Sequence, residues 1–147
     1  MRLNYDCIRD VLLVLEEKLE VRWNDEDSNF NFNTIGLVSL KGYLSDKDYS
    51  QEDIFYSVHN LIQANYIIST SVKSGSQISN YNITDITYEG HQFLQNIRPK
   101  TIWDKSKPVF KNLGTISVDI IKSVTSTVIS DTINHYLPGY LPSTQTP

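Results

Sequence analysis

Apolar residues recur at helical spacing near the start of the chain. The intervals between them are three and four residues, which places them on one face of a helix. They are Tyr5, Ile8, Leu12, Leu15 and Leu19. Asn4 can cap the helix with its side chain, and Asp6 suits the positive end of the helix dipole. The pattern predicts a first helix that begins after Asn4.

The character of the chain then changes twice. Trp23 to Asn29 is polar and rich in turn-forming residues, which predicts a loop. Phe30 to Thr34 alternates apolar and polar side chains like a short strand. Ile35 to Leu44 fits a short helix and an extended segment equally well.

A complete helix start follows at Ser50. Its hydroxyl can cap the helix, while Asp53 supplies the acidic partner of a capping box. Apolar residues at helical spacing then predict a buried stripe made of Ile54, Val58, Leu61 and Ile62. Asn65 tolerates the left-handed backbone conformation, so we expect the helix to end at Ala64-Asn65.

Two β-rich segments come next. Tyr66 to Val72 is β-branched and aromatic, and Tyr81 to Thr87 alternates apolar and polar residues. Lys73 to Asn80 lies between them and is rich in Ser, Gly and Asn. The three segments together predict an antiparallel hairpin with a long loop.

The stretch ITYEGHQFL, Ile86 to Leu94, poses a choice between catalysis and structure. His91 has no His or Cys at the spacing of a metal motif, and no Ser or Cys nucleophile is identifiable nearby. Thr87 fits a helix N-cap, and Gly90 shares a helix face with Leu94. We therefore interpret the stretch as a helix start, in which Gly90 allows a close approach to the first helix.

The order of these elements is that of a winged-helix domain, and several segments resemble one family. They are NYDCIRDVLLVLEE (Asn4 to Glu17), YSQEDIFYSVHNLIQANYI (Tyr49 to Ile67), ITYEGHQFLQNIR (Ile86 to Arg98) and Trp103 with Lys105 and Lys107. The family is found in phages and prophages of Gram-positive bacteria and is catalogued as domain of unknown function 2513. The resemblance covers nearly the whole chain and implies a winged-helix-like fold and a phage or mobile-element origin. It implies no activity and no functional residues.

The segment 113–137 is apolar on two sides when it is arranged as a helix. The two rows are Leu113, Ile116, Ile120, Val124 and Val128, and then Ile129, Ile133 and Leu137. Its many Ser, Thr, Val and Ile residues are mediocre helix formers, so an isolated helix would be marginal and needs a covering surface. Packing on its own domain and self-association are both open, and a membrane-surface helix is a third interpretation. Pro138 and Pro142 end the helix and predict a flexible tail over 138–147.

Charge is divided unevenly along the chain. Residues 1–97 carry 7 Lys and Arg against 14 Asp and Glu, whereas residues 98–147 carry 6 against 3. The candidate nucleic-acid contacts lie in or beside a basic connector: Arg98, Lys100, Lys105, Lys107 and Lys111. The helix at the recognition position opens with Gln51-Glu52-Asp53 and contains no Lys or Arg through Asn65. Any DNA binding is therefore expected to be weak and to use the connector.

No constellation of catalytic or metal-binding residues is visible. Asp25-x-Asp27-x-Asn29 resembles the start of a calcium loop, but Phe30 and Gly36 stand where that loop needs Gly and Glu. The single cysteine, Cys7, suits a reducing compartment, and neither a signal peptide nor a membrane span is visible. We expect a non-enzymatic protein of the bacterial cytoplasm that uses no cofactor or metal.

The sequence thus predicts an α+β protein with a winged-helix-like domain and a helical extension. The predicted parts are the domain (1–98), the basic connector (99–112), the amphipathic C-terminal helix (113–137) and the tail (138–147). The expected function is protein–protein contact and self-association into a homo-oligomer, with a host or phage protein, such as a defence protein, as a further candidate partner. The alternative is a phage DNA-binding regulator that contacts DNA through the connector.

Overall fold

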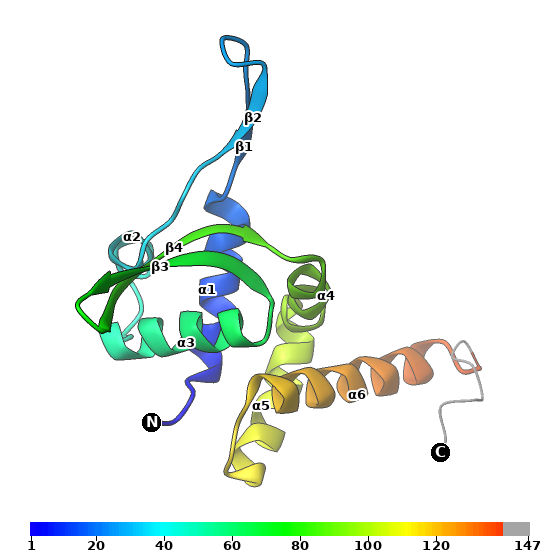
Figure 1. The fold of residues 1–147 in the computed structure, drawn as a ribbon. Helices are drawn as coiled ribbons and strands as arrows, with labels where there is room; N and C mark the ends of the chain where they lie inside the picture. The colour runs from blue at the N-terminus through cyan, green and yellow to red at the C-terminus, as the bar shows by residue number, and fades with distance from the viewer. Residues whose placement is uncertain (140–147) are drawn as a thin grey trace. The chain divides into compact units, whose positions relative to one another are not determined.

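A computed structural model describes residues 1–139 of the chain. It divides into two compact units, Met1–Leu94 and the part that begins at Gln95, which are described separately below. Within the described residues it has six helices and two antiparallel hairpins, so the predicted α+β class is confirmed (Figure 1).

Helix α1, Tyr5–Lys18, forms the centre of the first unit. As predicted, the Asn4 side chain caps it by accepting a 3.1 Å hydrogen bond from the backbone N–H of Cys7. The buried side chains of α1 are Cys7, Ile8, Val11, Leu12 and Leu15. Because they recur at helical spacing, one face of α1 enters the core while the other remains polar.

The predicted loop after α1 is confirmed only for residues 25–28, and a strand flanks it on each side. Strands β1, Val21–Asn24, and β2, Asn29–Phe32, pair antiparallel and form an arm that extends beyond the end of α1 (Figure 1). Asn33 closes the base of this arm: its backbone N–H donates to the Glu20 carbonyl at 3.2 Å, and its side chain accepts from the Glu20 N–H at 2.7 Å. The predicted strand at Phe30 to Thr34 is therefore half of a hairpin that begins nine residues earlier.

Helix α2, Leu37–Tyr43, resolves the ambiguous segment before Ser50. Just before it, Ile35 exchanges two 2.9 Å backbone hydrogen bonds with Ile83 and so pairs with β4 as a single bridge. Gly36 at the start of α2 has no capping side chain of its own. The Asn80 side chain, from β4, instead accepts a 3.0 Å hydrogen bond from the Leu37 N–H.

Helix α3, Gln51–Gln63, begins with the predicted capping box of Ser50 and Asp53. Its buried residues Ile54, Ser57, Val58 and Leu61 form the face that packs toward α1. Beyond the end of the helix, Asn65 has a φ of 61°, which is the left-handed conformation expected at this position. The local hydrogen-bonding signals in the sequence therefore predicted both ends of α3 correctly.

Strands β3, Ile67–Ser74, and β4, Gln77–Ile86, form the second hairpin. The predicted long loop is wrong, because Ser74 pairs with Gln77 and leaves only Gly75 and Ser76 in the turn. Gly75 has a φ of 65°, which glycine adopts without a steric cost. The polar residues on either side of the turn belong to the two strands.

Helix α4, Tyr88–Ile97, begins within the ITYEGHQFL stretch. The predicted N-cap is confirmed, since the Thr87 hydroxyl oxygen accepts a 3.0 Å hydrogen bond from the Gly90 N–H. Gly90 does approach its surroundings closely, but the partner is not α1. The nearest atom to a Cβ at this position would be the backbone carbonyl oxygen of Tyr66, at 2.0 Å.

The second unit contains two further helices. Helix α5, Lys100–Leu113, covers the predicted connector and buries Ile102, Trp103, Ser106 and Phe110. Gly114, with a φ of 73°, ends it, and Ser117 caps helix α6, Val118–Tyr136. Helix α6 therefore begins five residues after residue 113, where the sequence pattern placed its start. Residues 140–147 of the predicted tail lie outside the described residues.

Candidate interaction surfaces

The exposed side of α3 is polar and aromatic. Tyr56, His59 and Asn60 are half-buried on it, and Gln63 is exposed. The Nδ1 atom of His59 lies 2.8 Å from the Tyr81 hydroxyl of β4. Burial raises the pKa of Tyr81 above its usual value. This surface offers hydrogen-bonding groups but no cation to neutralise a phosphate.

Aromatic rings connect α3 to the second hairpin. The Phe55 ring stacks near both His59 and Tyr81, with ring centroids 5.9 and 5.4 Å away, and the three rings form a triangle. Next to this stack, an open cleft of about 540 Å³ lies among α2, the start of α3 and β4. Its lining includes Val38 and Phe55 as well as Lys41 and Glu52. No group in this lining has the hydrogen-bonding geometry of a nucleophile paired with a base.

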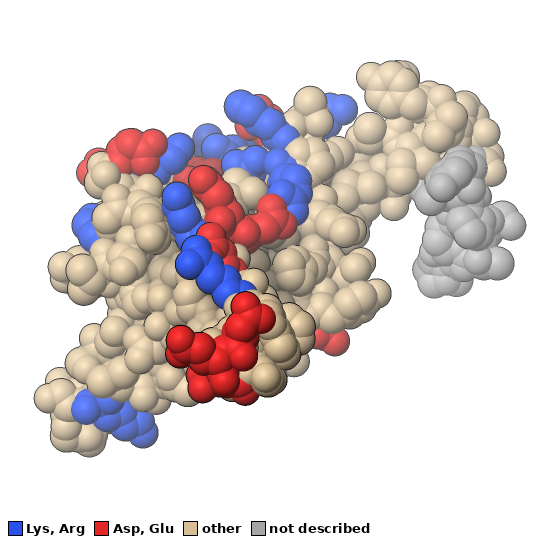
Figure 2. Space-filling model, turned by 90° about the horizontal axis from the view of Figure 1, so that it is seen from above, with Lys and Arg blue, Asp and Glu red and all other residues tan. Residues whose placement is uncertain are grey.

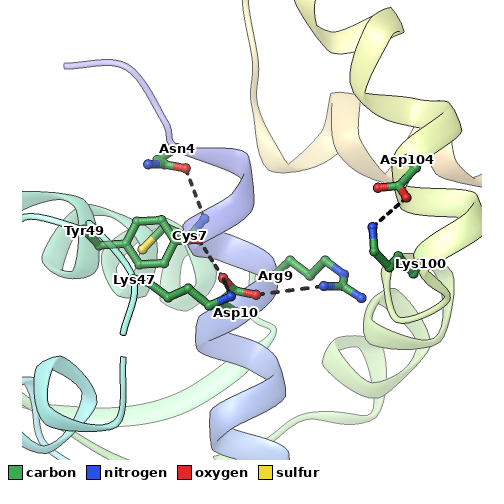
Figure 3. Close-up of polar contacts among 8 residues, drawn as sticks. All are labelled: Asn4, Cys7, Arg9, Asp10, Lys47, Tyr49, Lys100 and Asp104. Carbon is green, nitrogen blue, oxygen red and sulfur yellow. Dashed lines mark hydrogen bonds and ion pairs between the residues drawn. The ribbon is translucent and has the colours of Figure 1, made fainter. Parts of the chain in front are cut away.

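A polar cluster joins α1 to the segment before α3. The Tyr49 hydroxyl donates a 2.6 Å hydrogen bond to the Asp10 carboxylate, which also has Arg9 and Lys47 nitrogens at 3.9 Å (Figure 3). Burial raises the pKa of Tyr49, and the hydrogen bond to Asp10 raises it further. The Lys41 ammonium group donates to the Tyr49 carbonyl. Each charge has an assigned partner, so the cluster is structural.

Cys7 lies in the core of the first unit and is fully buried. Burial raises the pKa of its thiol to about 11, although the nearby Ser57 hydroxyl lowers it in part. A thiolate is the reactive form of cysteine, so a buried thiol with this pKa is unsuited to nucleophilic catalysis at neutral pH.

The described residues contain no group of three or more His, Cys, Asp or Glu side chains that could hold a metal ion. The carboxylates of the calcium-like stretch lie in the β1–β2 turn, where Asp25 accepts a 2.7 Å hydrogen bond from the Trp23 ring N–H. Asp27 accepts from the Asn24 side chain at 3.0 Å. His91 lies exposed on α4, where the Thr87 carbonyl accepts a hydrogen bond from its backbone N–H.

The candidate nucleic-acid contacts lie on or beside α5. Lys100 forms a 2.7 Å ion pair with Asp104 one turn later, as drawn in Figure 3. Lys105 and Lys111 are exposed, Lys107 is half-buried, and Arg98 lies between α4 and α5. On the face shown in Figure 2, basic and acidic side chains are interspersed. The ion pair with Asp104 offsets the charge of Lys100, so α5 presents less positive charge than its four lysines suggest.

The candidate assembly residues are divided between two helices. Leu113 is the exposed last residue of α5, and Ile116 lies before α6. The other six are on α6 or directly after it and are at least partly exposed: Ile120, Val124, Val128, Ile129, Ile133 and Leu137. The side of α6 that is fully covered consists of Val118, Ile121 and Thr125. At 100° per residue, the two predicted rows are the flanks of this buried stripe.

The first hairpin carries an apolar face that sequence reasoning missed. Val21 pairs with Phe32, and Trp23 pairs with Phe30, so all four side chains lie on the same side of β1 and β2. Each is more than half exposed, from 52% for Trp23 to 65% for Phe30. The signal in the sequence was two short alternating runs, Val21 to Asn24 and Asn29 to Phe32, on either side of a turn-rich segment.

No helix within residues 1–139 has the length and apolarity to cross a bilayer.

These features define an α+β protein with two separate exposed apolar surfaces and with no catalytic constellation among the described residues. The chain belongs to the family described as Hypothetical protein (DUF2513), whose sequence model matches residues 2–117. The resemblance seen in the sequence is thus confirmed. The match ends at Ser117, which is the N-cap of α6, so the matched residues do not include this helix.

The chain is also similar to an uncharacterized protein of Haemophilus influenzae Rd. The two are 28% identical over 138 residues, which cover 88% of this chain and 97% of that protein. No solved structure matches the chain.

Proposed function

We propose that this protein is a winged-helix-like adaptor of phage or mobile-element origin that acts in the bacterial cytoplasm. It works through protein contacts and self-association, with α6 as the assembly element. A host or phage protein, such as a component of a defence system, is its further partner. No step of this function requires catalysis or a cofactor.

The order of elements in the first unit supports the winged-helix assignment. Helix α1 is followed by the Ile35 bridge, α2, α3 and the β3–β4 hairpin, which are the elements of a winged-helix domain in their usual order. The β1–β2 hairpin is then an insertion between the first helix and the first short strand. Fold alone is not a function, and α3 has no Lys or Arg with which to grip a duplex.

The observation that carries the proposal is the incomplete cover of α6. This helix has 19 residues, of which only Val118, Ile121 and Thr125 are fully buried. The apolar flanks of that stripe are only partly covered, and the helix is rich in Ser, Thr, Val and Ile, which stabilise an isolated helix poorly. A second copy of α6 would cover such flanks, and the small Ser and Thr side chains would allow close approach.

Sedimentation of the full-length protein tests this proposal. The variant Ile120→Asp with Ile133→Asp places one charge on each apolar flank of α6. At position 120, in the first turn, an added acid favours the helix dipole, whereas at position 133, in the last turn, it opposes the dipole. The matched control is Ser123→Asp with Asn134→Asp, which adds the same charge at two exposed positions. This control carries the same cost at position 134, so the comparison isolates the apolar flanks.

We expect the wild type and the control to sediment as dimers or larger species. The Ile120→Asp, Ile133→Asp variant should sediment as a monomer with unchanged helical circular dichroism. A wild type that is monomeric at tens of micromolar would contradict the proposal, because α6 would then need no second copy.

A second candidate function is DNA binding through α5, favoured by the exposed ammonium groups of Lys105 and Lys111. The acidic first unit would weaken it, so we expect sequence-independent binding that is lost between low and physiological salt. Lys105→Gln with Lys111→Gln should lower affinity for random duplex and reduce the salt slope by about 2. Tight, sequence-specific binding that survives these substitutions would place DNA binding ahead of self-association as the function of this protein.

A further inference from the structure

We propose that the apolar face of the β1–β2 hairpin docks on the α5–α6 unit of a second copy of this chain, and that the contact is reciprocal. This inference rests on the proposed self-association and names its second surface. Each copy would insert its hairpin against the partly covered flank of the other copy's α6, beside the lysines of α5.

The hairpin has the composition of an interface. Val21, Trp23, Phe30 and Phe32 form one face, while Arg22, Asn24, Asn29 and Asn31 form the other. The Trp23 and Phe30 rings meet edge to face with centroids 5.0 Å apart, so the apolar side is ordered before any partner arrives. An isolated two-stranded hairpin is marginally stable in water, and a covering surface would stabilise this one.

The distribution of charge indicates which surface covers the apolar face of the hairpin. The segment 20–33 carries four carboxylates, and its single base, Arg22, is already bound to Glu20 at 2.8 Å. Two hairpins packed on one another would bring two acidic segments together, which opposes that arrangement. Residues 98–147 carry 6 bases against 3 acids, with Lys105 and Lys111 exposed on α5. The hairpin and the α5–α6 unit are therefore complementary in sign.

Area favours a reciprocal contact over a single one. Three half-exposed aromatic side chains and Val21 offer roughly 400 Å² of apolar surface, given 150–250 Å² for a whole aromatic side chain. A stable interface needs about 800 Å² from each partner. A copy that both donates its hairpin and receives the partner's hairpin reaches about that area. The reciprocal arrangement also closes the assembly as a dimer and prevents open-ended filaments.

The receiving surface has suitable dimensions. A shallow hollow of about 390 Å³ lies between Lys105 of α5 and the second half of α6, where Val128, Asp131, Thr132, His135 and Tyr136 line it. Lys105 is its one basic lining residue and Asp131 its one acidic residue, so the positive sign comes from the unit as a whole. The distance from Val128 to Tyr136 is about 12 Å at the rise of an α-helix. A four-residue strand spans about 13 Å, so the apolar face of the hairpin matches this part of α6 in length.

Complementation between two variants tests the inference. The hairpin variant is Trp23→Ser with Phe30→Ser, and its control is Asn29→Ser with Asn31→Ser on the opposite face. The α6 variant is Val128→Asp with Tyr136→Ser, two residues that line the hollow. If a hairpin docks on another copy's α6, each variant fails alone, but a mixture restores one of the two contacts.

We expect the hairpin variant to raise the dimer dissociation constant by about a hundredfold, while its control stays within about threefold of the wild type. A mixture of differently labelled hairpin and α6 variants should form a heterodimer that neither forms alone, and added salt should weaken it. Unchanged thermal unfolding of the separate variants would show that both remain folded.

Three results would overturn the inference. A hairpin variant that dimerises like the wild type would remove the hairpin from the interface and leave assembly through α6 standing. An α6 variant that still dimerises through its hairpin would place hairpin on hairpin. Two monomeric variants that do not combine when mixed would exclude docking in trans. A monomeric wild type would instead refute the proposed self-association itself.

Discussion

Gly90 lies so close to the Tyr66 backbone that a Cβ at position 90 would be 2.0 Å from the Tyr66 carbonyl oxygen. That oxygen also accepts a 3.0 Å hydrogen bond from the Thr87 N–H, so it is held in place. The start of α4 is thereby joined to the residue that follows the left-handed end of α3. The glycine is required by a backbone-to-backbone contact within the first unit, and His91 beside it is exposed.

Gly90→Val should therefore destabilise the protein by at least about 1–3 kcal/mol, because the helix must move away from Tyr66. Gly42→Ala is the matched control: it lies in α2, and a Cβ there would meet no atom within 4 Å. We expect the control to stabilise by up to about 1 kcal/mol, the difference in helix propensity. Denaturant midpoints measure both changes, and an unchanged midpoint for Gly90→Val would contradict the placement.

Asn80→Ala should cost about 1 kcal/mol of folding free energy, because it removes the acceptor for the Leu37 N–H at the start of α2. Asn80→Asp keeps a carbonyl-like oxygen at that position and adds a negative charge near the helix start, so it should be nearly neutral. Chemical denaturation of the wild type and the two variants measures their free energies of unfolding and so checks this order of stability. Equal losses in the two variants would show that the cap does not stabilise α2.

Tyr49→Phe tests the hydrogen bond to Asp10 through its pH dependence. Near neutral pH the variant should be less stable by about 1 kcal/mol. The pKa of Tyr49 is raised in the folded state, so the unfolded chain loses this proton first as pH rises above 10. That stability is present below pH 10 and is lost above it. The difference in unfolding free energy between wild type and variant should therefore become smaller above pH 10. A difference that does not change with pH would contradict the hydrogen bond between Tyr49 and Asp10.

Cys7 should react with an aromatic disulfide reagent only when the protein unfolds. The thiol is fully buried and its pKa is raised to about 11. Raising the pH from 7 to 9 should therefore speed the reaction of a free thiol with the reagent but not the reaction of Cys7. Absorbance of the released thiolate follows the reaction. Stoichiometric labelling of the folded protein at pH 8 would show that the first unit opens readily.

The sequence predicted well those features whose causes are local. The Asn4 cap, the Ser50 capping box and the left-handed Asn65 depend on hydrogen bonds and dihedral angles within a few residues. The position of α6 is also encoded locally, since Gly114 stops one helix and Ser117 starts the next. Apolar periodicity that continues through both residues concealed this boundary.

Features that depend on distant partners were missed. The first hairpin exists because Val21 pairs with Phe32, and neither short run indicates this pairing alone. Likewise, the pattern around Gly90 indicates a close approach but not which backbone lies there, and the answer, Tyr66, depends on the tertiary fold. Which apolar side of α6 is buried also depends on its packing with α5 and not on periodicity.

The closure of the first hairpin at its base makes it a module. Because Asn33 and Glu20 are already joined by two hydrogen bonds, the chain enters and leaves the arm at nearly the same point. Residues 21–32 could therefore be shortened, replaced or grafted onto another scaffold without changing the path of the chain through the core.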